Sequence, residues 1–364
     1  MYISSLEIEN FRNYSYQKIE LSPYTNVFYG NNAQGKTNIL EAVYLFSHGR
    51  SHRARTDNEL IKFGESFYDL NLLFSDKQRD YKARIRFLNN GKKQIKINNV
   101  PITKLSMLMS YLNVVMFSPE DLELIKGGPS EKRHFIDEAI SQLYPKYLSN
   151  LISYHKTLAQ KNSLLKNLKF SDKKSDAMLS VWNEQLAEFG CGIYISRRDF
   201  LNSLSQFASA IHSDISGEDF KISYAPGIRV NSDEKDLKKE FYEVLEQNQR
   251  REIELGSTQV GIQRDDFKIF VNGNEAKFFA SQGQQRTCVL TLKMAEAEFI
   301  NSLRGEYPVL LLDDIMSELD INRRKYLWER IIDKQVLLTC TDVDILNDSS
   351  NTKLFNVSGG KIIN

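Results

Sequence analysis

A glycine-rich loop near the start of the chain carries the clearest chemistry in the sequence. It fits the pattern G-x-x-x-x-G-K-[ST] at every fixed position and reads Gly30, Asn31, Asn32, Ala33, Gln34, Gly35, Lys36, Thr37, with Asn38 next. Glycines let the backbone approach a ligand, so that successive N–H groups point at phosphate oxygens. In this pattern Lys36 reaches the β- and γ-phosphates and the Thr37 hydroxyl ligates Mg²⁺. The loop therefore predicts a nucleoside triphosphate site rather than an ordinary glycine turn.

A pair of acidic residues follows a buried strand late in the chain. Residues 308–312 form a continuous apolar run, as in a parallel strand covered on both faces, and Asp313 and Asp314 come directly after it. The carboxyl end of such a strand lies beside the phosphate loop in an α/β sheet. We therefore expect Asp313 to hold Mg²⁺ through water and Asp314 to orient or deprotonate the attacking water. A helix cap or turn is the alternative, which the upstream phosphate loop disfavours.

A second candidate phosphate site begins another helix. Residues 281–286 read Ser-Gln-Gly-Gln-Gln-Arg and open a helical stretch from Thr287 to Phe299. A helix start of this kind can bind an anion through Ser281, Gly283 and Gln284, although the same residues also suit a plain helix cap. One chain does not need two such sites for one triphosphate. The economical hypothesis is that two subunits enclose ATP, each supplying one site.

Strands and helices must position these residues. Residues 26–29 predict a strand before the phosphate loop, and residues 38–45 predict an apolar-faced helix after it. Asn89-Asn90-Gly91 predicts a hairpin turn. Further strands are predicted at residues 67–74, 81–88, 93–98, 267–271 and 336–339.

The middle of the chain has a helical pattern. Apolar residues recur every three or four positions from Ile136 to Leu158, with Pro145 expected to kink or break the helix, and again from Trp182 to Ile211. A polar stretch at 171–176 separates the two runs, so we expect an antiparallel helical hairpin. The hairpin is either a projecting arm or part of the core of a second domain. We assign residues 1–118 and 258–364 to one α/β domain and residues 119–257 to a helical insertion.

Composition excludes several classes of protein. The net charge of +1 over 364 residues leaves no global basic field, so any nucleic-acid surface must be a local patch. The three cysteines are scattered, which disfavours a zinc site or a disulfide framework. The N-terminus lacks a signal-peptide pattern and no apolar run approaches 18 residues, so we expect a cytoplasmic protein without a membrane span.

Two basic clusters are candidates for such a patch. One contains Arg50, Arg53 and Arg55, and the other contains Lys132 and Arg133 beside Gly127-Gly128-Pro129. DNA binding without sequence readout needs only phosphate contacts of this kind. The alternative is that they are ordinary solvated charges, and for the first cluster contact with the nucleotide is a third possibility.

The order of these features resembles that of the ABC-type ATPases, specifically their SMC/Rad50/RecF branch. Phosphate loop, long insertion, Ser281 helix and acidic pair follow one another, and then comes Ser317-Glu318-Leu319-Asp320. The resemblance to the RecF family covers essentially the full length. Beyond the phosphate loop it rests on ENFRNY (9–14), HGRSHR (48–53), FSPEDL (117–122), GGPSEKR (127–133), RDD (264–266), SQGQQR (281–286) and LDDIMSELD (312–320).

This resemblance implies a fold and an activity. The fold would be α/β, an ABC-type, Rad50-head-like P-loop ATPase domain with an inserted α-helical domain. The activity would be weak, DNA-dependent ATP hydrolysis by a homodimer that forms on ATP and binds gapped or single-strand/duplex DNA. The partners would be RecR and RecO, acting in repair to load the recombinase RecA. By the same resemblance, Arg12 would lie near the nucleotide, Ser281 would contact the γ-phosphate held by the other subunit, and Asp320 would lie at the dimer interface.

The chain departs from the patterns of these families at four places. Gln263 stands where family members typically have His. Thr339-Cys340-Thr341-Asp342 occupies the place of the switch His of many ABC ATPases, and Asp314 replaces their Glu. No clear Gln-loop glutamine is present, and residues 117–121 are the positional candidate.

Three other classes of protein fit the sequence less well. The nucleotide-binding subunit of a transporter is disfavoured by the helical insertion and by the long distance to residues 281–286. A structural SMC-like protein would need a longer coiled coil and a hinge. A small-molecule kinase would have no use for residues 281–286.

Overall fold

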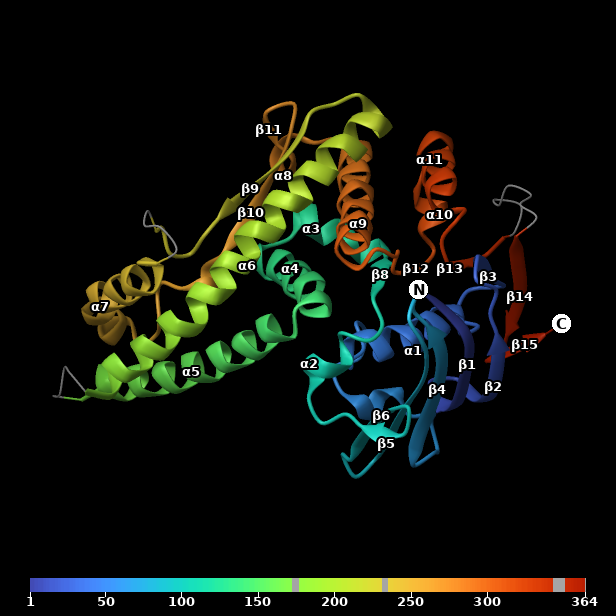
Figure 1. Cartoon of the computed structure of the whole chain (residues 1–364), viewed down its shortest axis with the longest axis horizontal. Coiled ribbons are helices and arrows are strands. Elements are labelled where there is room, and N and C mark those ends of the chain that lie inside the picture. The colour runs from blue at the N-terminus through green and yellow to red at the C-terminus, as the bar shows by residue number, and fades with distance from the viewer. Residues whose placement is uncertain (172–176, 231–234, 343–350, 364) are drawn as a thin grey trace. The chain divides into compact units, whose positions relative to one another are not determined.

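The computed structural model describes residues 1–171, 177–230, 235–342 and 351–363, and the chain divides into two units (Figure 1). Unit 1 consists of residues 1–122, 210–217 and 282–364, and unit 2 of residues 123–209 and 218–281. The polar stretch expected to join the two long helices lies outside the described residues from 172 to 176.

A mixed six-stranded sheet forms the centre of unit 1. Its order is β15-β14-β3-β13-β12-β8, with β15 antiparallel and the other neighbours parallel. The predicted strands at 26–29, 308–312 and 336–339 are all present in it, and β12 and β13 are buried at every position. The strands are β3 (Thr25–Tyr29), β8 (Val114–Phe117), β12 (Val309–Leu312), β13 (Val336–Cys340), β14 (Thr352–Ser358) and β15 (Lys361–Ile363).

A second, antiparallel sheet of unit 1 contains the predicted N-terminal strands. Its order is β2-β1-β4-β5-β6-β7, and β5 and β6 pair across the turn predicted at Asn89-Asn90-Gly91. Buried and exposed residues alternate along β5, so one face of the sheet joins the core and the other meets water. The strands are β1 (Tyr2–Phe11), β2 (Tyr14–Glu20), β4 (Phe67–Ser75), β5 (Asp80–Leu88), β6 (Lys93–Ile97) and β7 (Val100–Pro101).

Helix α1 (Lys36–His48) follows β3 and contacts strands of both sheets, namely β4, β8 and β13. The core of unit 1 contains apolar residues of α1, of the antiparallel sheet and of the mixed sheet, including Ile39, Leu70 and Leu311. The remaining helices of the unit are η1 (Asp57–Leu60), α2 (Leu105–Leu108), η2 (Pro119–Leu122), α9 (Gln282–Arg304), α10 (Ile315–Glu318) and α11 (Ile321–Ile331).

Unit 2 contains the predicted helical hairpin. Helix α4 (Pro129–Leu143) ends two residues before α5 (Pro145–Lys169), so the chain breaks at Pro145 as expected. Helices α5 and α6 (Ala177–Ser216) are antiparallel and lie together where α5 ends and α6 begins, and they diverge from there in Figure 1. At this end Thr157 bonds Gln185, and Leu165 and Leu168 pack in one cluster with Leu179. The sequence analysis did not single out α7 (Leu237–Leu255), which contributes Ile253 to the same cluster. The hairpin therefore packs into a helical core along this part of its length.

The boundaries of the units differ from those expected. Residues 258–281 group with the helical unit because β10 (Asp266–Val271) pairs with β9 (Phe220–Ala225), a strand that the sequence analysis missed. The end of α6 groups with unit 1, where the buried His212 ring is 2.9 Å from the Thr291 hydroxyl of α9. Unit 2 also contains α3 (Glu123–Lys126), η3 (Ile262–Arg264), β11 (Asn274–Glu275) and α8 (Ala276–Phe279).

Candidate nucleotide site and basic loop

The predicted phosphate loop joins β3 to α1 in a conformation that needs its glycines. Gly30 has φ +142° and Gly35 has φ +111°, in the region that favours glycine. A Cβ on Gly30 would lie 2.4 Å from the Val357 carbonyl oxygen, and one on Gly35 would lie 2.6 Å from Asn13 Oδ1. A larger side chain is therefore excluded at Gly30 by the backbone of Val357, and at Gly35 it would be strained by the positive φ and would displace the Asn13 amide. Helix α1 begins directly after Gly35 with its N–H groups facing the loop.

Lys36 lies against the loop beside an open pocket. Its Nζ donates hydrogen bonds to the carbonyl oxygens of Gly30 at 2.7 Å and Asn31 at 3.0 Å. The pocket has a volume of about 350 Å³ and is lined by polar atoms of unit 1, a setting that suits a phosphate chain. Its lining residues are Asn32, Ala33, Gln34, Gly35, Lys36, Thr37, Asn38, Arg53 and Asp314.

The structure brings together the two residues predicted to hold Mg²⁺. Asp313 Oδ1 accepts a hydrogen bond from Thr37 Oγ1 at 2.8 Å, although the two residues lie 276 positions apart. A hydroxyl and a carboxylate are the hard oxygen ligands that Mg²⁺ prefers, together with water and substrate phosphates. Within the described residues, no three His, Cys, Asp or Glu side chains gather into a metal cluster. The two oxygen ligands therefore fit an ion that also binds phosphate.

Asp314 also lines the pocket, in a strained backbone conformation. Its φ of 50° lies in the left-handed region, and its N–H donates to Thr339 Oγ1 at 2.9 Å. Burial and the neighbouring Asp313 raise the pKa of the Asp314 carboxyl, while Lys36 acts in the opposite direction. A carboxylate with a raised pKa is a stronger proton acceptor, which suits the role expected of Asp314.

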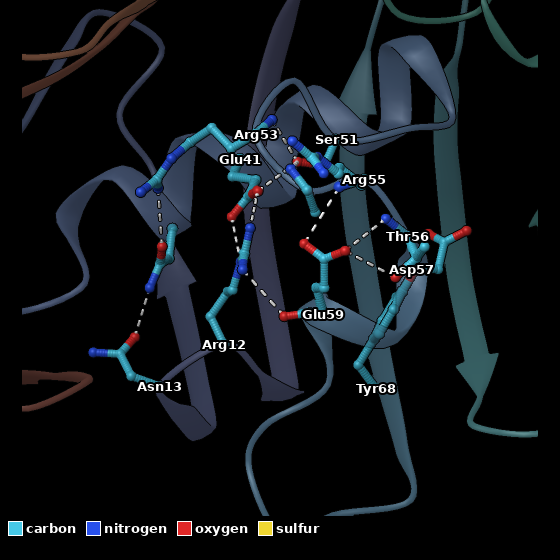
Figure 2. Close-up of polar contacts among 12 residues, drawn as sticks. Arg12, Asn13, Glu41, Ser51, Arg53, Arg55, Thr56, Asp57, Glu59 and Tyr68 are labelled. Atoms are coloured by element: carbon cyan, nitrogen blue, oxygen red, sulfur yellow. Dashed lines mark hydrogen bonds and ion pairs between the residues drawn. The ribbon is translucent and has the colours of Figure 1, made fainter.

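Arg12 is engaged by a buried carboxylate beside the loop (Figure 2). Its Nε and Nη2 donate to Glu41 of α1 at 2.8 and 2.7 Å, and Ser51 Oγ donates to the same carboxylate at 2.5 Å. The Glu41 side chain is 0% exposed. Burial is the largest single influence and acts to raise its pKa, but the hydrogen bonds from Arg12 and Ser51 and the charges of Arg12 and Arg53 together outweigh it, so the pKa of Glu41 is lowered. Arg12 therefore lies next to the P-loop helix and is not one of the residues lining the pocket.

The arginines of the first basic cluster lie in two settings: Arg53 lines the pocket, and Arg50 and Arg55 do not. Arg53 lines the phosphate pocket, and its Nη1 is 3.4 Å from Asn38 Oδ1, while Asn38 Nδ2 donates to Asn13 Oδ1 at 2.9 Å (Figure 2). Arg50 and Arg55 are exposed on the same loop. Arg53 is thus placed for contact with the nucleotide, and the other two side chains are accessible to a larger ligand.

The two residues of the second basic cluster, Lys132 and Arg133, are bonded within unit 2 and differ from the sequence prediction. The Lys132 side chain is only 6% exposed, and its Nζ donates to the Phe267 carbonyl at 2.7 Å and lies 3.3 Å from Asp266. Arg133 Nη1 donates to the Asp265 carbonyl at 2.7 Å, and burial lowers its pKa. The prediction that Lys132 contacts DNA is wrong, because its ammonium group is used inside unit 2. One nitrogen of the Arg133 guanidinium is likewise used in a hydrogen bond within unit 2.

The predicted second phosphate site falls where the chain passes from unit 2 into unit 1. Ser281 is the last residue of unit 2, and Gly283 and Gln284 lie in the first turn of α9. Neither Gly283 nor Gln284 is among the lining residues of the pocket. Asp320 caps α11 by accepting a hydrogen bond from the Arg323 N–H at 2.9 Å.

Three residues around the site were missed or given no role. Glu41 and Asn13 connect segments around the P-loop helix, and Thr339 connects the two acids. A charged residue within the apolar run around Glu41 was an available signal, because such a charge must find a partner when buried. In the sequence, Thr339 is distinguished only as part of the segment that replaces the switch His.

Comparisons with known proteins agree with this geometry. The family described as the RecF/RecN/SMC N terminal domain matches residues 2–361. The DNA replication and repair protein RecF of Clostridium beijerinckii is 42% identical over 366 residues, covering 100% of this chain and 99% of the relative. RecF of Ruminiclostridium cellulolyticum is 44% identical over 369 residues, with the same coverage.

Solved structures give the same result. The structure of the recombination mediator protein RecF with ATPrS, in the RecFOR pathway, matches with a TM-score of 0.93 and 36% identity, covering 99% of this chain and 97% of that one. An Smc head domain from Pyrococcus furiosus matches with a TM-score of 0.57 at 17% identity, covering 100% and 96%, and shares the fold.

The fold and the site thus define a P-loop ATPase of the ABC type, built like an SMC head. Within this class, the chain belongs to the RecF family of DNA replication and repair proteins. The expected fold and family are confirmed, and the transporter and kinase alternatives are set aside. Among the described helices, none is both long and apolar enough to cross a membrane.

Proposed function

We propose that this protein is an ATP-dependent DNA-binding ATPase of recombinational repair, in which ATP holds two copies together on DNA and slow hydrolysis releases them. The hydrogen bond between Asp313 and Thr37, which lines the phosphate pocket, carries the proposal, because it joins the two halves of a Mg²⁺-nucleotide site. Solved relatives are described as RecF with ATP and RecF with ATPrS in the RecFOR pathway. We accordingly propose RecR and RecO as partners in loading RecA at gapped or single-strand/duplex DNA.

The residues around the pocket have distinct tasks in this mechanism. Lys36 exchanges its bonds to the Gly30 and Asn31 carbonyls for phosphate oxygens, and the backbone N–H groups of the loop receive the remaining phosphate charge. Thr37 and Asp313 would hold Mg²⁺, which neutralises charge on the β- and γ-phosphates when bound. Asp314 orients the attacking water and accepts its proton.

The second subunit would complete the site. Residues 281 and 282 are exposed at the start of α9, and a helix start presents N–H groups suited to phosphate. We propose that Ser281, Gly283 and Gln284 of one copy contact the triphosphate held by the P-loop of the other.

Sedimentation tests this assembly. The Asp314→Asn variant with ATP and Mg²⁺ is expected to sediment as a dimer at micromolar concentration, because bound ATP is then not consumed. The same variant without ATP, and Lys36→Ala with ATP, are the controls and are expected to remain monomers. A monomer in all three samples at high protein concentration contradicts the two-subunit site.

DNA binding tests the coupling between the two ligands. With ATP the wild type is expected to bind duplex and gapped DNA more tightly than without ATP, and Lys36→Ala is expected to lose this gain. Electrophoretic mobility shifts or fluorescence anisotropy with single-stranded, duplex and gapped DNA measure the effect. Equal affinity of the wild type and Lys36→Ala in the presence of ATP would exclude the coupling.

The salt dependence of DNA affinity tests whether Arg50 and Arg55 contact DNA phosphates. Each lost phosphate contact lowers the slope of log affinity against log salt by about 1. The Arg50→Gln/Arg55→Gln double variant is therefore expected to have a shallower slope than the wild type. Lys325→Gln removes an exposed charge on α11 and serves as the matched control with an unchanged slope.

A further inference from the structure

Thr339 lies where the two acidic residues of the site meet. It is the fourth residue of β13, which pairs in parallel with β12 so that Leu338 is opposite Leu312. Continuing that register by one residue puts Thr339 level with Asp313. The Thr339 side chain is 0% exposed, so its hydroxyl must find its partners within the protein.

The Thr339 hydroxyl makes one bond to each acidic residue. It donates to Asp313 Oδ1 at 2.7 Å and accepts from the Asp314 N–H at 2.9 Å. The first bond orients the Asp313 carboxylate. The second holds the backbone of Asp314 in the left-handed conformation that directs this residue to the pocket. One buried hydroxyl thus fixes two neighbouring residues whose tasks differ.

Thr37 makes a similar hydrogen bond to Asp313, but this bond cannot orient Asp313 while nucleotide is bound. Its hydroxyl also donates to Asp313 Oδ1, at 2.8 Å, but in the proposed function this hydroxyl is a Mg²⁺ ligand. Thr339 is remote from the loop in sequence and enclosed in the sheet, so its bond to Asp313 does not compete with ligand binding.

We propose that Thr339 is a positioning residue for ATP hydrolysis, which keeps Asp313 and Asp314 aligned when Thr37 turns to the bound nucleotide. This inference rests on the proposed function. Groups that orient the ligands of a metal typically change metal affinity or activity by 10–100-fold when removed.

The isosteric variant Thr339→Val tests the proposal, since it removes the hydroxyl and keeps the volume. We expect its kcat for ATP hydrolysis to fall about tenfold or more, and its KM to rise only as far as the Mg²⁺-dependent affinity is lost. Thr339→Ser keeps the hydroxyl and is expected to restore most of the rate. Thr25→Val is the matched control, because Thr25 is a buried threonine opposite the start of β13, and is expected to hydrolyse ATP at the wild-type rate.

A second readout does not depend on turnover. Equilibrium binding of a fluorescent ATP analogue, measured in EDTA and in Mg²⁺, gives the gain in affinity that the ion provides. Thr339→Val is expected to reduce this gain while leaving the affinity in EDTA unchanged, and Thr339→Ala replaces it if the valine variant does not fold.

The outcomes separate the inference from the function on which it rests. Wild-type rates and wild-type Mg²⁺ dependence in Thr339→Val overturn the positioning role. An equal loss of affinity with and without Mg²⁺, or no rescue by Thr339→Ser, also overturns it and leaves only a structural role. A wild-type protein that neither binds nor hydrolyses ATP would instead refute the proposed function itself.

Discussion

Asp314→Asn is expected to lower ATP hydrolysis by about 10²–10⁴-fold, the usual contribution of a positioned general base. Asp314 lines the phosphate pocket, and its carboxyl pKa is raised by burial and by Asp313, so it is suited to accept a proton from water. An amide has the same shape but cannot accept that proton. Phosphate release under single-turnover conditions measures the effect, and ATP binding by the variant is expected to persist.

The same variant is expected to be no less stable than the wild type. In the absence of nucleotide and Mg²⁺, the folded protein binds a proton at Asp314 more tightly than the unfolded chain does. Ionised Asp314 therefore disfavours folding. Its contribution to the free energy of unfolding becomes more unfavourable as the pH rises from the usual Asp pKa to the raised pKa of Asp314. Asn carries no charge at any pH and tolerates the left-handed conformation well, so the substitution removes this cost without adding strain.

Thermal unfolding in EDTA at neutral pH, compared with the same measurement below the usual Asp pKa, tests this. The unfolding temperature of Asp314→Asn relative to the wild type is expected to be equal or higher at neutral pH, with no advantage in acid. Glu329→Gln, at a 61% exposed side chain whose ion-pair partner Lys325 is also exposed, is the control for loss of a surface charge. Unimpaired hydrolysis by Asp314→Asn would exclude Asp314 as the base, and a clear loss of stability at neutral pH would contradict the electrostatic argument.

The parts of the site that could be predicted from sequence are those in which neighbouring residues share one task. The glycines and Lys36 form one contiguous loop, and a buried strand ending in Asp313 and Asp314 is visible as an apolar run. Their meeting could also be expected, since parallel strands end at one edge of a sheet. The hydrogen bond between Thr37 and Asp313 agrees with that expectation.

The other features of the site and of the fold depend on strand register and burial, which cannot be read from a single sequence. Thr339 acquires its role only because β13 lies beside β12 in one register. Lys132 has the charge and the glycine-rich neighbourhood of a phosphate contact, yet α4 turns it toward the Phe267 carbonyl. The grouping of the chain differs from the boundary expected at residue 258 because the pairing of β10 with β9 joins segments 41 residues or more apart.

Arg12→Met is expected to destabilise unit 1 by about 3–5 kcal/mol, the usual cost of leaving a buried charge without its partner. Without Arg12, the 0% exposed Glu41 would keep the Ser51 hydrogen bond and the more distant charge of Arg53. Arg12, in contrast, is 22% exposed and also donates to the Glu59 carbonyl (Figure 2). Removing Glu41 therefore leaves a cation that water can partly solvate. Glu41→Gln is accordingly expected to cost less than Arg12→Met.

The pH dependence of the pair has a defined sign. The pKa of Glu41 is lowered in the folded state, so the pair contributes to stability above the usual Glu pKa and loses that contribution as the pH falls through the lowered value. The difference in unfolding free energy between the wild type and Glu41→Gln is therefore expected to be largest near neutral pH and to shrink in acid.

Urea unfolding can isolate this effect in unit 1. The chain has two tryptophans, and a Trp182→Phe background leaves Trp328 of α11 as the only one, so its fluorescence reports on unit 1. In that background Arg12→Met/Glu41→Gln is expected to lose less than the sum of the two single variants, because neither charge is then left without a partner. Glu329→Gln removes one member of an exposed ion pair and is expected to cost at most about 1 kcal/mol. If Arg12→Met cost no more than this control, the Arg12–Glu41 bond would be incidental to the fold, and the basic loop would have to be held beside α1 by its other contacts.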